Sequence, residues 1–194
     1  MSRTVRQATP ADAAAIARIY APFCTSTSIT FETEAVSPEA MAHRMLMLGD
    51  KYPWLVMDLD GDVAGYAYAA PHHERAAFRW AANVSVYISD PHRRSGIGRE
   101  LYESLLCVLR LQGFIHAIAG VTLPNEPSVG LHQTLGFKLI GQYPQIGYKL
   151  GAWRDVGWWQ KPLVDPLPNT PSEPRLMSDV VRDTRFAAIL SAAP

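Results

Sequence analysis

The stretch VSVYISDPHRRSGIGRELYESLL (84–106) constrains what this chain can fold into more than any other. Its first residues are β-branched and aromatic and predict a strand that ends at Asp90-Pro91. From about Ile97 to Gly113, apolar side chains recur at helical spacing and predict a long amphipathic helix with Gly113 as its C-cap. A strand that enters such a helix through a glycine turn needs a sheet on which the helix can pack.

The rest of the chain follows the same plan. Residues 28–36 alternate enough to be extended, and residues 54–71 predict a hairpin that turns at Asp60-Gly61-Asp62. Helices are predicted to begin at Thr9-Pro10 and at Ser37-Pro38, where a capping residue precedes a proline. The expected order is β-α-α-β-β-β-α-β-α-β-β. It predicts an α/β fold with a mixed sheet and helices on both faces, because crossovers give parallel strand pairs and hairpins give antiparallel ones.

The chain of 194 residues is long enough for one domain with a buried core and an appendage. We expect the domain to cover residues 1–163. Residues 164–194 are expected to form a proline-rich linker, DPLPNTPSEP, and a helical tail over 177–190. The tail either extends an interface or projects freely.

Charge and composition exclude several classes of function. Lys plus Arg and Asp plus Glu number 18 each, and a nucleic-acid partner is not expected because a broad binding surface needs a surplus of cations. The apolar stretches are too short for a bilayer and the N-terminus has no signal-peptide pattern, so we expect a cytoplasmic protein without a membrane partner. Cys24 and Cys107 fit neither a CxxC nor a zinc pattern and are expected to be reduced, mostly buried thiols. No metal is expected, because no pair of histidines has metal-ligand spacing.

The turn at 92–99 has the composition of an anion site. Its glycines are Gly96 and Gly98, and its arginines are Arg93, Arg94 and Arg99. Glycines let a ligand approach the backbone, and the first amides of the following helix point outwards at its positive end, so the turn predicts a phosphate or pyrophosphate cradle. A Walker loop is excluded because no Gly-Lys-Ser/Thr follows, and Leu101 occupies the third glycine position of a dinucleotide fingerprint. A plain turn with solvated arginines remains the alternative.

The pattern Arg-x-x-Gly-x-Gly at 93–98, between the VSVYI strand and the long helix, resembles the acyl-CoA loop of the GNAT superfamily of N-acetyltransferases. Asn125 followed by LHQTLGF (131–137) resembles the next strand-and-helix unit of that superfamily. Several motifs in order are similar to the phosphinothricin acetyltransferase family: TFETE (30–34), KYPWLVMDLDGDVAGYAYAAP (51–71), LPNEPSVGLHQTLGF (123–137) and WRDVGWWQ (153–160). Enzymes of that family acetylate the α-amino group of phosphinothricin and related compounds such as methionine sulfoximine. The resemblance covers about residues 3–163.

This resemblance implies a GNAT-type acyl-CoA N-acyltransferase fold, with a central, mostly antiparallel twisted sheet that is splayed at the cofactor site. It also implies acetyl-CoA as co-substrate and direct transfer in a ternary complex. Backbone groups of Val86, Tyr87 and Ile88 are implied to pair with the pantetheine arm like an added strand. The implied pyrophosphate site consists of Arg93, Arg94, Ser95, Gly96, Ile97, Gly98 and Arg99. Asn125 is implied to contact the cofactor arm, although without the family match it is a turn-former between two prolines.

Two positions bear on the chemistry. His132 is expected to carry proton transfer, because a neutral imidazole can pass protons near pH 7; the alternative is a structural histidine on a short helix. Relatives carry a glutamate, usually called the general base, just before the VYV-type strand, and this sequence has Asn83 there. An amide cannot accept a proton at neutral pH, although it can orient a water or bind the amine. Three explanations stay open: a water relayed to His132 is the base, the substrate differs, or turnover is slow.

An amino acid with a second anionic or polar head needs cations and aromatic walls around it. Arg75 matches a family position and is expected to fork onto a carboxylate or phosphinate. Phe31 and Phe78 are the expected walls. An ordinary surface arginine and two core phenylalanines are the alternatives.

Three tryptophans near the end of the domain are Trp153, Trp158 and Trp159. They either pack in the core or, as the resemblance implies, belong to a homodimer in which the last strands lie near the partner's active site.

The main functional hypothesis is an acetyl-CoA-dependent N-acetyltransferase for a small amino-acid-like amine of the phosphinothricin, methionine sulfoximine or methionine sulfone type. The second is an acetyltransferase for a peptide N-terminus or a polyamine. A polyamine calls for an acidic cleft, and residues 71–80 offer Arg75 and Arg79 against only Glu74. The third is a non-catalytic acyl-CoA-binding module, because Asn83 replaces the usual glutamate.

Overall fold

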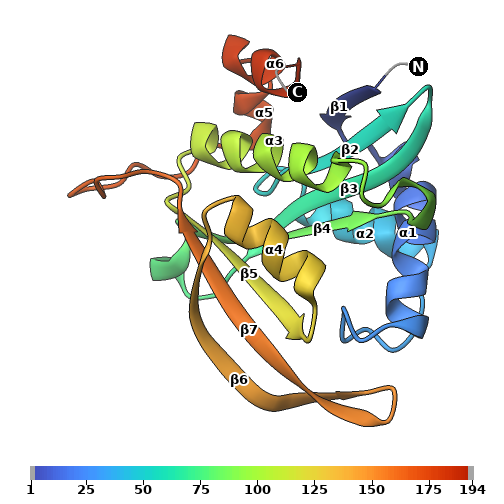
Figure 1. Cartoon of the computed structure of the whole chain (residues 1–194). Helices are drawn as coiled ribbons and strands as arrows, with labels where there is room; N and C mark the ends of the chain where they lie inside the picture. The colour runs from blue at the N-terminus through green and yellow to red at the C-terminus, as the bar shows by residue number, and fades with distance from the viewer. Residues whose placement is uncertain (1–2, 192–194) are drawn as a thin grey trace.

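A computed structural model of the chain describes residues 3–191 and has a seven-stranded sheet with the strand order β1-β2-β3-β4-β5-β7-β6. The strands are β1 (Arg3–Gln7), β2 (Trp54–Leu59), β3 (Asp62–Pro71), β4 (Ala81–Ile88), β5 (His116–Leu123), β6 (Lys138–Lys149) and β7 (Ala152–Pro162). The α-helices are α1 (Ala13–Ser26), α2 (Pro38–Leu48), α3 (Ile97–Gln112), α4 (Glu126–Thr134), α5 (Met177–Val180) and α6 (Thr184–Ser191). Up to β7 this is the order predicted from the sequence (Figure 1).

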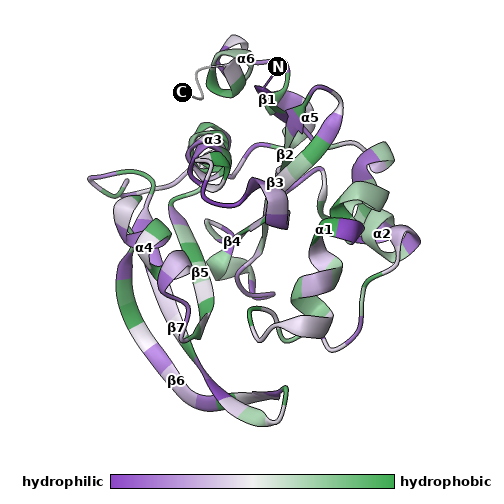
Figure 2. Cartoon of the chain, turned by 45° about the vertical axis from the view of Figure 1, so that its right-hand side comes forward, coloured by the Kyte–Doolittle hydropathy of each residue, from purple (hydrophilic) through white to green (hydrophobic). Residues whose placement is uncertain are grey.

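Helices cover both faces of the sheet, as predicted. α1 and α2 lie on one face, and α3 and α4 lie on the other (Figure 2). β2 shows why both faces are buried: Leu55 and Met57 pack into the cluster around α3, whereas Trp54 and Val56 pack into the cluster around α1 and α2. Because side chains of a strand alternate between faces, an apolar run such as WLVM supplies both cores at once.

The sheet opens between β4 and β5. These two strands are parallel and pair only from Ala81–His116 to Asn83–Ile118, whereas the other neighbouring strands pair antiparallel over most of their length. Beyond Asn83 the two strands separate, so residues 84–88 keep their partners on β3 and lose them on β5. This is the splayed, mostly antiparallel sheet that the resemblance implied.

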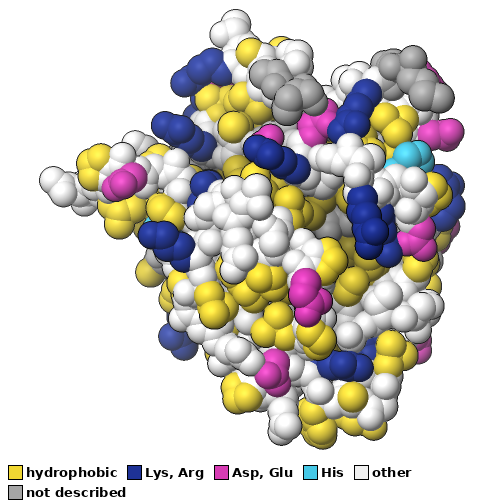
Figure 3. Space-filling view, viewed as in Figure 1, with side chains coloured by type: hydrophobic (Ala, Val, Ile, Leu, Met, Phe, Trp, Pro, Cys, Tyr) yellow, Lys and Arg dark blue, Asp and Glu magenta, His cyan; other side chains and the backbone are white. Residues whose placement is uncertain are grey.

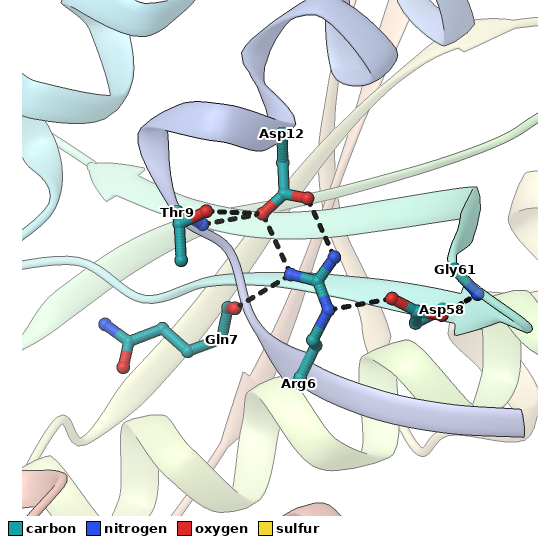
Figure 4. A network of polar contacts seen from close by, with 6 residues as sticks. All are labelled: Arg6, Gln7, Thr9, Asp12, Asp58 and Gly61. Atoms are coloured by element: carbon teal, nitrogen blue, oxygen red, sulfur yellow. Dashed lines mark hydrogen bonds and ion pairs between the residues drawn. The ribbon is translucent and has the colours of Figure 1, made fainter.

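The first strand is fastened to its neighbours by a network of charged groups (Figure 4). The guanidinium of Arg6 donates to both carboxylate oxygens of Asp12, at 2.9 and 2.8 Å, and to Asp58 on β2 at 3.0 Å. Asp12 also accepts from the backbone amide of Thr9 at 2.7 Å, so it caps the turn that begins α1. The Thr9-Pro10 helix start predicted from the sequence is therefore confirmed.

Residues 28–36 differ from the prediction of an extended segment. They form bends and irregular backbone and join no strand. Side-chain contacts hold them instead: the hydroxyl of Tyr20 lies 2.6 Å from that of Thr30, and Nζ of Lys149 donates to the carbonyl oxygen of Thr30 at 2.7 Å. These contacts come from α1 and β6, and Arg44 of α2 adds an ion pair with Glu32, which a local alternation pattern cannot reveal.

The predicted tail helix is divided in two. Asp183 lies between α5 and α6. Its Oδ1 accepts from the amide of Arg185 at 3.1 Å, so its carboxylate caps the N-terminus of α6. The tail packs on the domain, because Met177, Val180 and Phe186 form a buried cluster with Val108 of α3. Cys107, on the same helix, is exposed; the prediction that both cysteines are mostly buried is therefore wrong for Cys107 and correct for Cys24.

Candidate active site

A cavity opens where β4 and β5 separate. It is lined by Ile29, Val84, Ser85, Val86, Tyr87, Tyr102, Gly120, Val121, Asn125, Ser128 and His132. It therefore joins four of the residues predicted for the site, Val86, Tyr87, Asn125 and His132, which come from β4, the start of α4 and α4 itself.

The β4 edge of this cavity has backbone groups without strand partners. The carbonyl oxygen of Val84 accepts from the hydroxyl of Tyr102 at 3.1 Å, so it points away from β3. Backbone groups alternate in direction along a strand, and those of Val86 and Ile88 therefore point the same way as those of Val84. An extended ligand laid in the cavity can pair with them as an added strand does. Tyr87 contributes differently, because its ring is packed between Tyr20, Phe23 and Tyr66.

The glycine turn lies at the start of α3. Gly96 has a φ of +85° and Arg94 a φ of +60°, so the loop turns through two left-handed residues before the helix begins. The amides of Arg99 and Glu100 donate to the carbonyl oxygen of Gly96, both at 3.1 Å. Among the residues the structure describes, the amides of Gly96, Ile97 and Gly98 have no hydrogen-bond acceptor, which leaves them free for an anion.

The three arginines of the turn differ in their partners. Arg93 pairs with Asp90 at 2.7 Å and lies over the ring of Phe23, and Arg99 pairs with Glu103 at 2.8 Å. Arg94 is exposed and has no ion pair or hydrogen bond with any residue from 3 to 191. Arg94 is therefore the side chain of the turn whose charge is not already balanced.

A fourth arginine, not considered from the sequence, holds the loop. Nε of Arg3 donates to Glu100 at 2.8 Å, and its Nη1 donates to the carbonyl oxygen of Ser95 at 3.2 Å. Ile97 is 1% exposed, so its side chain anchors the helix start in the core and only its backbone faces the turn.

His132 is almost fully buried, with 3% exposure, and it contacts Tyr102, which also lines the cavity. Its Nδ1 lies 2.7 Å from the carbonyl oxygen of Ser128, and because a carbonyl oxygen only accepts, Nδ1 carries the hydrogen. Nε2 lies 3.2 Å from the hydroxyl of Tyr102. Burial lowers the pKa of His132 below its ordinary value of 6.5, against the opposing effect of the bond to Ser128. Burial also raises the pKa of Tyr102 well above its usual range, so both side chains are neutral at pH 7.

Asn125 caps α4, because its Oδ1 accepts from the amide of Ser128 at 3.2 Å. Its Nδ2 has no hydrogen bond with a described residue, so it is available to a ligand in the cavity. The turn-forming role and the ligand-binding role considered for this residue are thus compatible.

Asn83 lies at the point where β4 and β5 separate. Its Oδ1 is 2.9 Å from Nδ1 of His72, a residue of the loop that follows β3. Asn83 does not line the cavity itself, although the next two residues, Val84 and Ser85, do.

The three residues predicted for the amine substrate lie in different places. Phe31 is on the loop between α1 and α2, against Gly147 of β6. Phe78 contacts the rings of His72 and His73, and it is 43% exposed rather than part of the core. Arg75 lines another cavity, with Tyr52 and residues of the 173–176 segment, so the structure does not bring it to the cavity of His132.

Sequence reasoning missed Tyr102 as a member of the site. It lies three residues before Leu105 and seven before Leu109 on the buried face of α3, so its spacing is that of a core residue. The hydroxyl in an otherwise aliphatic stripe was the signal, because a buried Tyr hydroxyl usually needs a partner.

The chain is similar in sequence and in fold to known acetyltransferases. A family model for the acetyltransferase (GNAT) domain matches residues 5–158. The chain is 41% identical to a phosphinothricin N-acetyltransferase of Streptomyces viridochromogenes over 88% of this chain and 93% of that protein. It is 34% identical to an L-methionine sulfoximine/L-methionine sulfone acetyltransferase of Pseudomonas aeruginosa, over 88% and 100%. A phosphinothricin acetyltransferase of Sinorhizobium meliloti, solved with acetyl-CoA, superposes with a TM-score of 0.84 at 34% identity over 90% and 96%.

The chain therefore belongs to the GNAT family of acetyltransferases and is an N-acetyltransferase. Within that family it belongs with the phosphinothricin acetyltransferase-like enzymes. Across residues 3–191, no helix has both the length and the apolar character needed to cross a bilayer.

Proposed function

We propose that this enzyme transfers the acetyl group of acetyl-CoA to the α-amino group of a small amino-acid-like substrate of the phosphinothricin, methionine sulfoximine or methionine sulfone type. The observation that carries the proposal is the cavity at the opened sheet, which joins a free strand edge on β4 to the His132–Tyr102 pair. The similarity to enzymes named for these substrates supports the substrate class.

In this proposal the pantetheine arm lies along β4 and pairs with backbone groups of Val86 and Ile88. The pyrophosphate lies at the start of α3, where free amides and the unpaired guanidinium of Arg94 balance its charge. Asn125, at the start of α4 in the same cavity, donates to the arm through its Nδ2.

Acetyl transfer forms a C–N bond and breaks the C–S bond of the thioester. The amine nitrogen loses a proton and the departing thiolate gains one. His132 and Tyr102 form a relay for that proton: the hydroxyl of Tyr102 passes it to Nε2 of His132, and the reverse step delivers it to the sulfur. His132 suits this role because it is neutral between turnovers, and the lone pair of its Nε2 competes with the carbonyl oxygen of Val84 for the single hydroxyl hydrogen of Tyr102.

Release of free thiol from acetyl-CoA tests the proposal. The purified enzyme is incubated with phosphinothricin, methionine sulfoximine, methionine sulfone, a polyamine and a short peptide with a free N-terminus. We expect release with one or more of the first three. Release only with the polyamine or the peptide would favour those substrates instead. Binding of acetyl-CoA without release for any amine would favour a non-catalytic module.

We further propose a homodimer formed through the hairpin of β6 and β7. This hairpin carries seven large hydrophobic side chains that are more than half exposed: Leu139, Ile140, Tyr143, Ile146, Tyr148, Leu150 and Trp153. Hydrophobic side chains gather over the part of the molecule where these strands lie (Figure 3). Apolar surface of this kind is typical of an interface between subunits. Cytoplasmic localisation belongs to the same proposal and is consistent with two free cysteines.

A further inference from the structure

The position expected to hold a general base is occupied by an amide, and the structure shows what that amide contacts. Oδ1 of Asn83 lies 2.9 Å from Nδ1 of His72, and Nδ2 of Asn83 lies 3.4 Å from the carbonyl oxygen of Pro71. Reversing the amide would place its oxygen against the carbonyl of Pro71, so the two contacts together fix its orientation.

This orientation also fixes the protonation of the imidazole. The amide oxygen only accepts hydrogen bonds, so Nδ1 of His72 carries the hydrogen and donates it to Asn83. Nε2 then presents a lone pair, and it has no hydrogen bond with any residue in the described range 3–191. Asn83 therefore holds His72 in the tautomer that can accept a proton.

His72 does not line the cavity of the opened sheet, but two of its contacts, Asn83 and Trp158, connect it to residues that do. Asn83 precedes Val84 and Ser85, which line that cavity. On the other side, the ring of His72 meets the edge of Trp158 at 6.2 Å between centroids, and Trp158 packs on Gly120, another lining residue. Asn83 and Trp158, which hold the imidazole, are thus each next to a residue that lines the cavity where the thioester is proposed to lie.

The surroundings of the ring are apolar or neutral. Besides Asn83 it contacts Phe78 and Trp158, which do not titrate. The charged or titratable groups of its own loop are His73, Glu74 and Arg75, and all three are exposed. The imidazole has no charged group among these contacts, so its Nε2 is available to an incoming ammonium group.

We propose that Nε2 of His72 is the general base of this enzyme and that Asn83 is its positioning residue. The proposal rests on the proposed acetyltransferase function. Nε2 takes one proton from the substrate ammonium and later returns it to solvent. The freed nitrogen lone pair forms the C–N bond to the acetyl carbon, the C–S bond breaks, and the second proton lost by nitrogen reaches the thiolate through Tyr102 and His132.

His72→Gln tests the base. Glutamine can still donate to Asn83 but cannot accept a proton, so we expect kcat to fall by about 100-fold or more while the affinity for acetyl-CoA and the melting temperature stay within error. The defect should shrink as the pH approaches the pKa of the amine, because the substrate then arrives deprotonated. His73→Gln is the matched control, since that ring is exposed and does not contact Asn83; its rate should stay within about twofold of wild type.

Chemical rescue gives a readout that a purely structural role would not move. In His72→Ala, added imidazole should restore part of the lost rate in proportion to its concentration. If the wild-type enzyme turns over and His72→Gln has an unchanged kcat, His72 is not the general base. The same conclusion follows if imidazole does not rescue a folded His72→Ala. Either result would leave the proposed acetyltransferase function intact. Absence of thiol release by the wild-type enzyme with every amine would instead overturn the proposed function, and this inference with it.

The role of Asn83 is tested by two variants of similar size. Asn83→Asp keeps an oxygen that accepts from Nδ1, although it loses the bond to the carbonyl oxygen of Pro71, so we expect it to retain most of the activity. Asn83→Leu removes the acceptor and lets the imidazole change tautomer and rotate, so we expect kcat to fall at least tenfold while KM for acetyl-CoA stays the same. Equal rates in the two variants would exclude the positioning role.

Discussion

At position 94 an arginine lies in a left-handed backbone conformation with its charge unbalanced, between neighbours whose charges are paired. We expect Arg94→Ala to weaken acetyl-CoA binding about tenfold, the loss of one charge-assisted contact to a phosphate. A smaller loss of acetyl-CoA affinity is expected for Arg93→Ala, because Arg93 already pairs with Asp90. Titration calorimetry measures the affinity of both variants for acetyl-CoA. Unchanged affinity in a folded Arg94→Ala would remove this residue from the cofactor site.

His132 makes a second prediction at the scale of a residue. Its pKa is lowered from 6.5 by burial, so near and below that pH the unfolded chain binds a proton that the folded chain does not. The free energy of unfolding should therefore fall as the pH drops through about 6.5. Urea unfolding between pH 5 and pH 8 should show that the free energy of unfolding of His132→Gln falls less steeply with decreasing pH than that of the wild type. Some pH dependence should remain in the variant, because burial also lowers the pKa of His116. Identical slopes for variant and wild type would contradict this reading.

At the scale of elements, β1 depends on a few charged contacts. The carboxylate of Asp12 joins α1 to β1 through Arg6, and its side chain is only 8% exposed. We expect Asp12→Ala to lower the free energy of unfolding by about 2 kcal/mol, since it removes a helix cap and leaves Arg6 with Asp58 alone. Chemical denaturation measures the change. Glu173→Ala, which breaks an exposed pair with Arg79, should cost less than about 0.5 kcal/mol.

The same network has a pH dependence. The pKa of Asp12 is lowered from its ordinary 3.8, chiefly by the bonds from Arg6, so its contribution is present above that pH and is lost as the pH falls below it. The difference in stability between wild type and Asp12→Ala should therefore narrow in acid.

At the scale of the whole molecule, the hairpin of β6 and β7 decides the assembly. We expect the wild-type enzyme to be a dimer by light scattering and Trp153→Asp to be largely monomeric, because a charge at the 60% exposed Trp153 would be buried in the interface. Leu46→Asp is the matched control: Leu46 is 75% exposed on α2, and its replacement should leave the mass unchanged. A monomeric wild type at micromolar concentration would contradict the dimer.

Much of this architecture was predictable from local signals. The order of strands and helices, the hairpin at Asp60-Gly61 and the glycine turn before α3 follow from periodicity, capping residues and glycine conformations, which act within a few residues. The predicted cofactor residues near β4 and α3 came from the same stretch of chain, together with its resemblance to a family.

The tertiary structure decided what depends on distant parts of the chain. The opening between β4 and β5, the contact of Tyr102 with His132, the bond from His72 to Asn83 and the docking of the tail on α3 each join groups from separate elements. No periodicity within one segment encodes such a contact, because it depends on how segments far apart in sequence pack. The sequence by itself determined the elements and the loop that can hold an anion. Only the packing of those elements placed an imidazole beside the amide at the position where the family resemblance leads us to expect a carboxylate.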